Sequence, residues 1–146
     1  MLNTERVKAD FTQYLKQGKY RITPERFLVL DAVLGYEGHF DADELFLRVK
    51  TNGIRVSRAT VYNTLDLLLD CGVVAKFRLG DNHSRYEKTC GKPHHDHLIC
   101  LECGEIIEFV NKKIEKLQEE VCLENHFKAQ STSLQIFGVC AKCRKD

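Results

Sequence analysis

The chain has 146 residues, of which 43% are hydrophobic and 29% are charged. This composition is typical of a folded globular protein and excludes a disordered or low-complexity chain. Lys and Arg number 22 against 21 for Asp and Glu, so the net charge of +1 neither indicates nor excludes a nucleic-acid partner. No apolar run is long enough to cross a membrane, and the N-terminus lacks a secretory signal. We therefore expect a cytoplasmic protein with no membrane partner.

Four helices are predicted in the first part of the chain. The first spans roughly residues 4–17, and the others start at Pro24, after Asp41 and after Ser57. Thr23 before Pro24, Asp41 with Glu44 and Ser57 are typical helix caps. Two β-rich segments follow, at residues 73–79 and 84–88, joined by a turn at Gly80-Asp81-Asn82. Helices followed by a hairpin are the order of a winged helix-turn-helix.

The pattern changes after a predicted linker at residues 89–93. Strands are expected at residues 95–101, 105–110 and 133–139, with a helix at 112–125. A unit of this size buries too small a core to be stable on its own and usually needs a metal or a partner subunit. The predicted fold class is α+β, with an N-terminal winged helix-turn-helix domain (1–88) and a small C-terminal α/β dimerisation domain (94–146).

The cysteine spacing is the strongest chemical signal. Two Cys-x-x-Cys pairs, Cys100 with Cys103 and Cys140 with Cys143, lie in one stretch of 44 residues. A two-residue spacer lets one turn aim both sulfurs at one ion, and two such turns complete the closed tetrahedral shell that suits Zn²⁺. The alternative is a redox dithiol, which typically occurs as a single copy in a thioredoxin-like context. The pattern favours structural zinc.

A histidine cluster precedes the first Cys-x-x-Cys pair. In a strand, His95 and His97 would lie on one face, and His94 and Asp96 on the other. Imidazole and carboxylate ligands suit divalent ions such as Fe²⁺, Co²⁺, Zn²⁺ and Mn²⁺. The alternative is a solvated strand edge, which three histidines and an aspartate in four positions argue against.

Three segments carry a resemblance to a known family. They are Arg21–Arg26 near the start, Ala59–Leu65 in the predicted recognition helix, and His94–Gly104 with the following Ile106–Phe109. The terminal segment Gly138–Cys143 also fits. In this order, and over nearly the whole chain, they strongly resemble the ferric uptake regulator (Fur) family of metal-dependent, dimeric repressors.

The resemblance implies three sets of metal ligands. The first is a structural zinc site with the four cysteines already named. A regulatory site would use His39, Glu87, His95, His97 and Glu108. A third site, present in some members, would use His94, Asp96 and Glu115, but Thr132 stands where its further histidine is usual. That departure puts the third site in doubt.

The expected DNA contacts lie at the exposed start of the helix after Ser57. Arg58, Thr60, Tyr62 and Asn63 have side chains that pair with bases or phosphates. Many family members have arginine where Asn63 stands, so the preferred operator is expected to differ. Backbone or minor-groove contacts are expected from Lys19, Arg21, Arg26 and Arg85. The partners are then a second copy of the chain and a pseudo-palindromic duplex.

The predicted function is a metal-responsive repressor, with Fe²⁺ as the signal. Family members respond to iron, zinc, manganese or peroxide, and Glu108 stands where peroxide sensors tend to carry aspartate. The predicted regulatory shell has no cysteine, which disfavours a dedicated zinc sensor unless Cys90 joins it. Peroxide sensing is the alternative within the family. A metalloenzyme and a zinc-binding interaction module are alternatives outside it, but we predict no catalytic residue and no small organic substrate.

Overall fold

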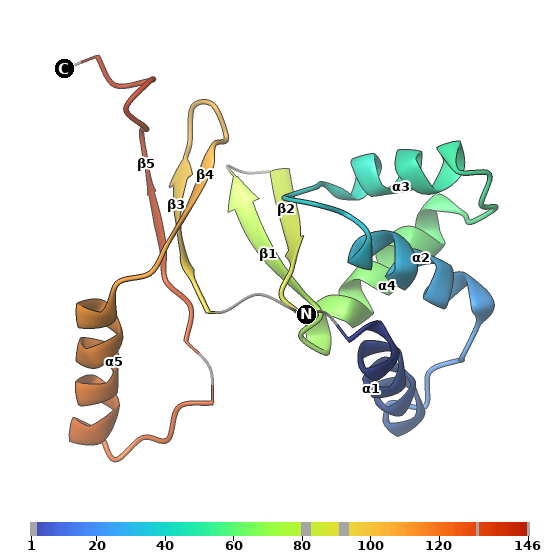
Figure 1. Cartoon of the computed structure of the whole chain (residues 1–146), viewed down its shortest axis with the longest axis horizontal. Helices are drawn as coiled ribbons and strands as arrows, with labels where there is room; N and C mark the ends of the chain where they lie inside the picture. The colour runs from blue at the N-terminus through green and yellow to red at the C-terminus, as the bar shows by residue number, and fades with distance from the viewer. Residues whose placement is uncertain (1–2, 80–82, 91–93, 131, 146) are drawn as a thin grey trace. The chain divides into compact units, whose positions relative to one another are not determined.

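The chain folds into two compact units, Met1–Lys92 and Pro93–Asp146, each with its own sheet (Figure 1). The computed structural model describes residues 3–79, 83–90, 94–130 and 132–145. Within these ranges, no helix combines the length and the apolar character that a membrane span requires.

The first unit contains four helices that begin at side-chain caps. They are α1 (Thr4–Gln17), α2 (Pro24–Leu34), α3 (Ala42–Thr51) and α4 (Arg58–Asp70). Thr23 and Ser57 accept hydrogen bonds from backbone N–H groups in the first turns of α2 and α4, and Asp41 forms a capping box with Glu44. These caps satisfy N–H groups that have no acceptor inside the helix. The three caps predicted from the sequence are confirmed.

The hydrophobic core of the first unit lies between the helices. Leu15 of α1, Leu30 of α2, Leu45 of α3 and Leu65 of α4 are completely buried in one cluster. Phe11 meets Phe27 edge-on, with ring centroids 5.5 Å apart. Burial of one face of α4 leaves its other face exposed to solvent.

Replacement of Leu65 by alanine is expected to lower the free energy of unfolding by about 2–5 kcal/mol, because truncation leaves a cavity in the core. Urea unfolding followed by circular dichroism measures the change. Leu47 of α3 is 61% exposed, and its replacement by alanine is the control, with an expected effect below about 0.5 kcal/mol. Equal losses at the two positions would contradict the packing described.

The wing is an antiparallel hairpin of β1 (Val74–Leu79) and β2 (His83–Lys88). Gly72, with φ at +83°, ends the preceding helix in the left-handed conformation that favours glycine. The backbone of Phe40, just before α3, exchanges two hydrogen bonds with Tyr86 of β2, at 2.9 and 2.7 Å. The loop before α3 is therefore tied to the wing. The predicted turn at residues 80–82 lies outside the described residues.

The second unit is a three-stranded sheet with one helix. Its elements are β3 (Asp96–Cys100), β4 (Ile106–Phe109), α5 (Lys112–Glu124) and β5 (Gln135–Gly138). The central strand β3 is antiparallel to β4 and parallel to β5. In the parallel pair Cys100 is the partner of Gly138, so both strands end at the same edge of the sheet.

The second unit buries few side chains. Among its described residues, the buried ones are Asp96, His97, Ile99 and Cys100. No residue of α5 is buried, although the helix carries apolar side chains. A unit with so small a core needs a further source of stability.

The predicted α+β fold class is confirmed, with a winged helix-turn-helix followed by a small α/β unit. The strand bounds differ from the predicted ones by one or two residues, because strand ends are set by pairing and carry no sequence mark. The parallel pairing of β3 with β5 was not predicted. Residues 91–93 of the predicted linker lie outside the described residues.

Candidate metal centre and nucleic-acid interface

Four cysteines converge at one end of the sheet in the second unit. Cys100 ends β3 and Cys103 lies in the turn to β4, while Cys140 and Cys143 follow β5. Their sulfur atoms all lie within 4.8 Å of one another. The sulfurs of Cys103 and Cys140 are 3.7 Å apart, although these residues are 37 positions apart in the chain. The parallel pairing of β3 and β5 produces this convergence, because it brings both turns to the same edge.

Backbone hydrogen bonds hold each cysteine turn. The N–H of Gly104 donates to the carbonyl of Cys100 at 3.0 Å, and the N–H of Cys143 donates to the carbonyl of Cys140 at 3.0 Å. Gly104 has φ at +76°, which a residue with a side chain rarely adopts. The N–H of Cys140 also points at the sulfur of Cys100, at 3.4 Å. The turns are therefore shaped by the backbone and present their sulfurs in fixed positions.

The four thiols shift one another's ionisation. Backbone N–H groups of Cys103 and Cys140 lower the pKa of Cys100 to about 6, because they stabilise its thiolate. Hydrogen bonding to the sulfurs of Cys140 and Cys103 raises the pKa of Cys143 to about 12. Four negative charges at this spacing repel one another strongly unless a cation lies among them. The cluster therefore fits a divalent ion held by four thiolates, in which no coordination position remains open for catalysis.

The second unit also carries a histidine and carboxylate group on β3 and β4. The rings of His95 and His97 lie with centroids 4.7 Å apart, which agrees with a common face. His97 is the register partner of Glu108 on β4, and the Nε2 of His95 lies 3.5 Å from a carboxylate oxygen of Glu108. These three residues offer ligand atoms for a divalent ion.

The first unit has a histidine and carboxylate pair of its own. The Nε2 of His39 lies 2.7 Å from a carboxylate oxygen of Glu87, whose side chain is 2% exposed. His39 precedes Phe40 and Glu87 follows Tyr86, so the backbone bridge between Phe40 and Tyr86 brings the pair together. Periodicity and spacing did not predict this pairing, because the bridge joins residues 46 positions apart. Only the family resemblance placed His39 and Glu87 in one site.

Two of the residues expected in a third metal site lie together. The Nε2 of His94 is 3.4 Å from the carboxylate of Asp96, which also accepts a hydrogen bond from the N–H of Leu134 at 3.2 Å. His94, Glu115 and Thr132 line a cavity of about 570 Å³. Cys122 of α5 lines the same cavity, which the sequence did not indicate.

The expected DNA-contacting residues gather at the exposed start of α4. Arg58, Tyr62 and Asn63 are exposed, whereas Thr60 is half-buried and lies 2.9 Å from the hydroxyl of Ser57. Asn63 and Thr60 line a cavity of about 200 Å³ together with Arg21, in the loop before α2, and Arg26, in its first turn.

Two further basic residues lie outside α4. Lys19 is exposed in the loop between α1 and α2 and has a positive φ of 58°. On the wing, the Nη2 of Arg85 lies 3.6 Å from a carboxylate oxygen of Glu44.

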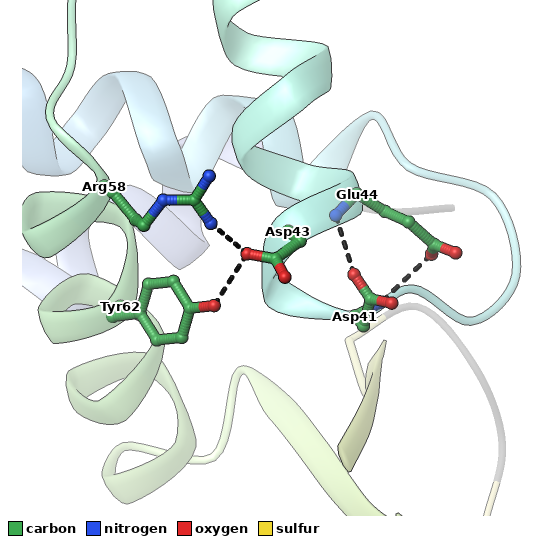
Figure 2. Close-up of polar contacts among 5 residues, drawn as sticks. All are labelled: Asp41, Asp43, Glu44, Arg58 and Tyr62. Carbon is green, nitrogen blue, oxygen red and sulfur yellow. Dashed lines mark hydrogen bonds and ion pairs between the residues drawn. The ribbon is translucent and has the colours of Figure 1, made fainter. Parts of the chain in front are cut away.

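One acidic residue at this surface was missed by sequence reasoning. The carboxylate of Asp43, in the first turn of α3, accepts hydrogen bonds from both Arg58 and Tyr62 (Figure 2). Contacts across 15 and 19 residues leave no local pattern in a sequence.

A winged helix-turn-helix, followed by a small α/β unit with four converging thiols and histidine–carboxylate pairs, defines a metal-binding transcriptional regulator. The model of the ferric uptake regulator family matches residues 17–137. The chain belongs to this family.

Individual relatives agree with this family over most of their length. The ferric uptake regulation protein of Campylobacter jejuni is 36% identical over 135 residues, which cover 91% of this chain and 85% of the relative. The structure of the Helicobacter pylori regulator Fur, described as having three functional metal binding sites, is similar with a TM-score of 0.78 and 27% identity, covering 99% of this chain and 97% of that one. The Pseudomonas aeruginosa regulator with manganese gives a TM-score of 0.76 and 27% identity, covering 89% and 97%.

Proposed function

We propose that this protein is a repressor whose DNA affinity depends on a divalent metal bound by both units. The observation that carries the proposal is a histidine–carboxylate pair in each unit. His39 and Glu87 are 2.7 Å apart in the first, and His95 and Glu108 are 3.5 Å apart in the second. In the proposed site, one ion takes ligands from both pairs and from His97.

Such an ion would hold together the two parts of the chain that the linker at residues 89–93 joins, and so act as a clamp. A ligand shifts a conformational equilibrium only by the difference in its affinity for the two states. An ion that needs donors from residues 1–88 and from residues 94–146 binds only those arrangements that bring the donors together. A coupling of about 1–3 kcal/mol changes DNA affinity roughly 5- to 150-fold. The first segment is then the DNA-binding domain and the second the metal-binding dimerisation domain.

The four converging cysteines are proposed to hold a structural Zn²⁺. Four thiolates suit the tetrahedral preference of this ion, and a closed shell serves folding rather than catalysis. The small core of the second unit supports this role, because metal-binding free energy then becomes folding free energy.

We assign Fe²⁺ to the regulatory site. The proposed donors are three imidazoles and two carboxylates, which suit borderline divalent ions and contain no thiolate. Glu108, at a position where peroxide sensors of the family tend to carry aspartate, supports iron. Mn²⁺, Zn²⁺ and Co²⁺ are the competing ions. His94, Asp96 and Glu115 are proposed as donors of a further, weaker site, since Thr132 replaces its usual histidine.

The apolar surface of the second unit supports a homodimer. Val121 and Leu123 of α5, Phe127 beyond it, and Ile136 and Phe137 of β5 are all 45% or more exposed. Exposed apolar surface of this kind marks interfaces between protein chains. In a dimer, two α4 helices read half-sites about one helical turn of DNA apart, on a pseudo-palindromic operator. Such a repressor works where the chromosome lies, so a cytoplasmic location is part of the proposal.

An anaerobic titration of operator binding tests the metal assignment. Duplexes are first selected by the protein from a randomised pool, and their retention is then measured against Fe²⁺, Mn²⁺ and Zn²⁺. We expect Fe²⁺ to raise the affinity roughly 5- to 150-fold and a chelator to reverse it. If Zn²⁺ alone supports binding, the iron assignment is wrong. Loss of binding on adding peroxide to the iron form, but not to the manganese form, would favour a peroxide sensor.

A further inference from the structure

The start of the recognition helix is tied to an acidic residue of α3. Asp43 is 62% exposed, and one of its carboxylate oxygens accepts hydrogen bonds from the Nη1 of Arg58 and from the hydroxyl of Tyr62, the latter at 2.8 Å (Figure 2). Arg58 and Tyr62 are neighbours on one face of α4, one helical turn apart. A single carboxylate therefore sets the direction of both side chains.

The carboxylate has a defined position because the first turn of α3 is held by its capping box. The N–H of Glu44 donates to the Asp41 carboxylate at 2.7 Å, and the N–H of Asp41 donates to the Glu44 carboxylate at 3.0 Å. Figure 2 shows these reciprocal bonds beside Asp43. The residue that contacts α4 thus belongs to an ordered turn, not to a loose loop.

The guanidinium of Arg58 is held by a second contact as well. It lies over the ring of Phe46 at 4.7 Å from the centroid, while its edge faces Asp43. An arginine held at its face and at one edge has lost much of its rotamer freedom before DNA arrives. Of its five N–H donors, the contact with Asp43 uses one at Nη1, so the group can still donate to a base or a phosphate.

Tyr62 is held in a defined hydrogen-bonding role. Its hydroxyl carries one proton, and this proton is directed to Asp43. The hydrogen bond to Asp43 raises the pKa of Tyr62, so the phenol stays neutral. Towards DNA the oxygen can then act only as an acceptor, which matches the amino groups of adenine and cytosine in the major groove.

We propose that Asp43 is a positioning residue that orders Arg58 and Tyr62 for base reading and so raises discrimination between operator and other DNA. The inference rests on the proposed DNA-binding function. A negative charge at the DNA surface weakens binding to every duplex through repulsion of phosphates. On the operator, the ordered side chains offset this penalty through base contacts. On other DNA nothing offsets it.

The test compares the wild type with Asp43→Asn, which removes the charge and keeps a hydrogen-bond acceptor for Tyr62. Dissociation constants are measured for a duplex selected by the wild type and for a scrambled duplex, in the presence of Fe²⁺ without oxygen. We expect tighter binding to scrambled DNA. We also expect the dissociation constant for scrambled DNA divided by that for the selected duplex to fall about tenfold, since one good base contact discriminates by roughly that factor. On scrambled DNA, the slope of log affinity against log salt concentration should steepen by an amount that corresponds to at most about one additional phosphate contact, because Arg58 is released from Asp43.

Two controls separate positioning from general effects. Asp10→Asn, on the exposed side of α1, makes the same change in net charge and should leave the ratio unchanged. Asp43→Ala should reduce the ratio less in a Tyr62→Phe background than alone, because effects of coupled residues are not additive. Thermal unfolding confirms that each variant folds.

The outcomes also separate this inference from the function on which it rests. If the wild type selects no duplex, the DNA-binding proposal fails, and the role of Asp43 fails with it. If the wild type selects an operator and Asp43→Asn binds with an unchanged ratio, the inference alone is overturned. An equal fall of the ratio in Asp10→Asn would likewise overturn it.

Discussion

Replacement of Cys103 by serine is expected to unfold the second unit and abolish dimer formation. The physical reason is that this unit buries few side chains, so a metal must supply much of its folding free energy. Zinc-finger peptides gain about 10–16 kcal/mol from Zn²⁺, which is comparable to the whole stability of a typical small domain. Cys103 is exposed, so the loss cannot be attributed to packing. Zinc content measures the loss of the metal, circular dichroism the unfolding and sedimentation velocity the loss of the dimer.

Cys122→Ser is the matched control for this variant. Cys122 lies half-buried on α5, outside the four-thiol cluster, and its replacement should leave zinc content unchanged. A Cys103→Ser protein that retained one zinc per chain and a native spectrum would overturn the structural site. Equal zinc loss in both variants would show that the metal is not held by the cluster.

Replacement of His39 by glutamine is expected to remove most of the metal response of DNA binding. In the proposed clamp His39 is a ligand from the first unit, and without it an ion gains little by bringing the two parts of the chain together. The increase in operator affinity on adding Fe²⁺ should shrink from roughly 5- to 150-fold to about twofold or less. Glutamine keeps an N–H donor for Glu87, so the buried carboxylate retains a partner. Fluorescence anisotropy with labelled operator, with and without Fe²⁺, measures the response.

His126→Gln makes the same change at an exposed position after α5 and should respond to metal as the wild type does. Metal-free DNA affinity should be similar in all three proteins, because neither substitution touches α4. If His39→Gln keeps its full response to Fe²⁺, His39 is not a ligand of the regulatory ion and the proposed site is wrong at this residue.

The sequence-based predictions that the structure confirms rest on interactions between residues that are close in the sequence. Thr23, Asp41 and Ser57 cap helices because a side-chain oxygen before a helix satisfies N–H groups that otherwise lack an acceptor. The 3.6-residue periodicity of apolar residues predicted the helices whose faces form the core of the first unit. The Cys-x-x-Cys spacing predicted that each pair of sulfurs shares one turn. Each of these signals lies within a few residues of the feature that it predicts.

The arrangement of the candidate ligands depends on pairings over long distances in the chain. The parallel register of β3 and β5 brings Cys103 within 3.7 Å of Cys140, and the bridge from Phe40 to Tyr86 brings His39 to Glu87. The family resemblance supplied these residues as a set, but periodicity and spacing did not. Neither pairing has a local signal, because strand register is set by which faces are buried together.

The sequence by itself determined where helices begin, that the chain contains a winged helix-turn-helix, and which side chains offer atoms that could ligate a metal. Only the tertiary structure decided which of those residues meet, and it alone revealed that Asp43 holds Arg58 and Tyr62. The physical reason is the range of the interactions. Caps and periodicity act within one or two helical turns, whereas a contact between α3 and α4 exists only after the core has packed the two helices together.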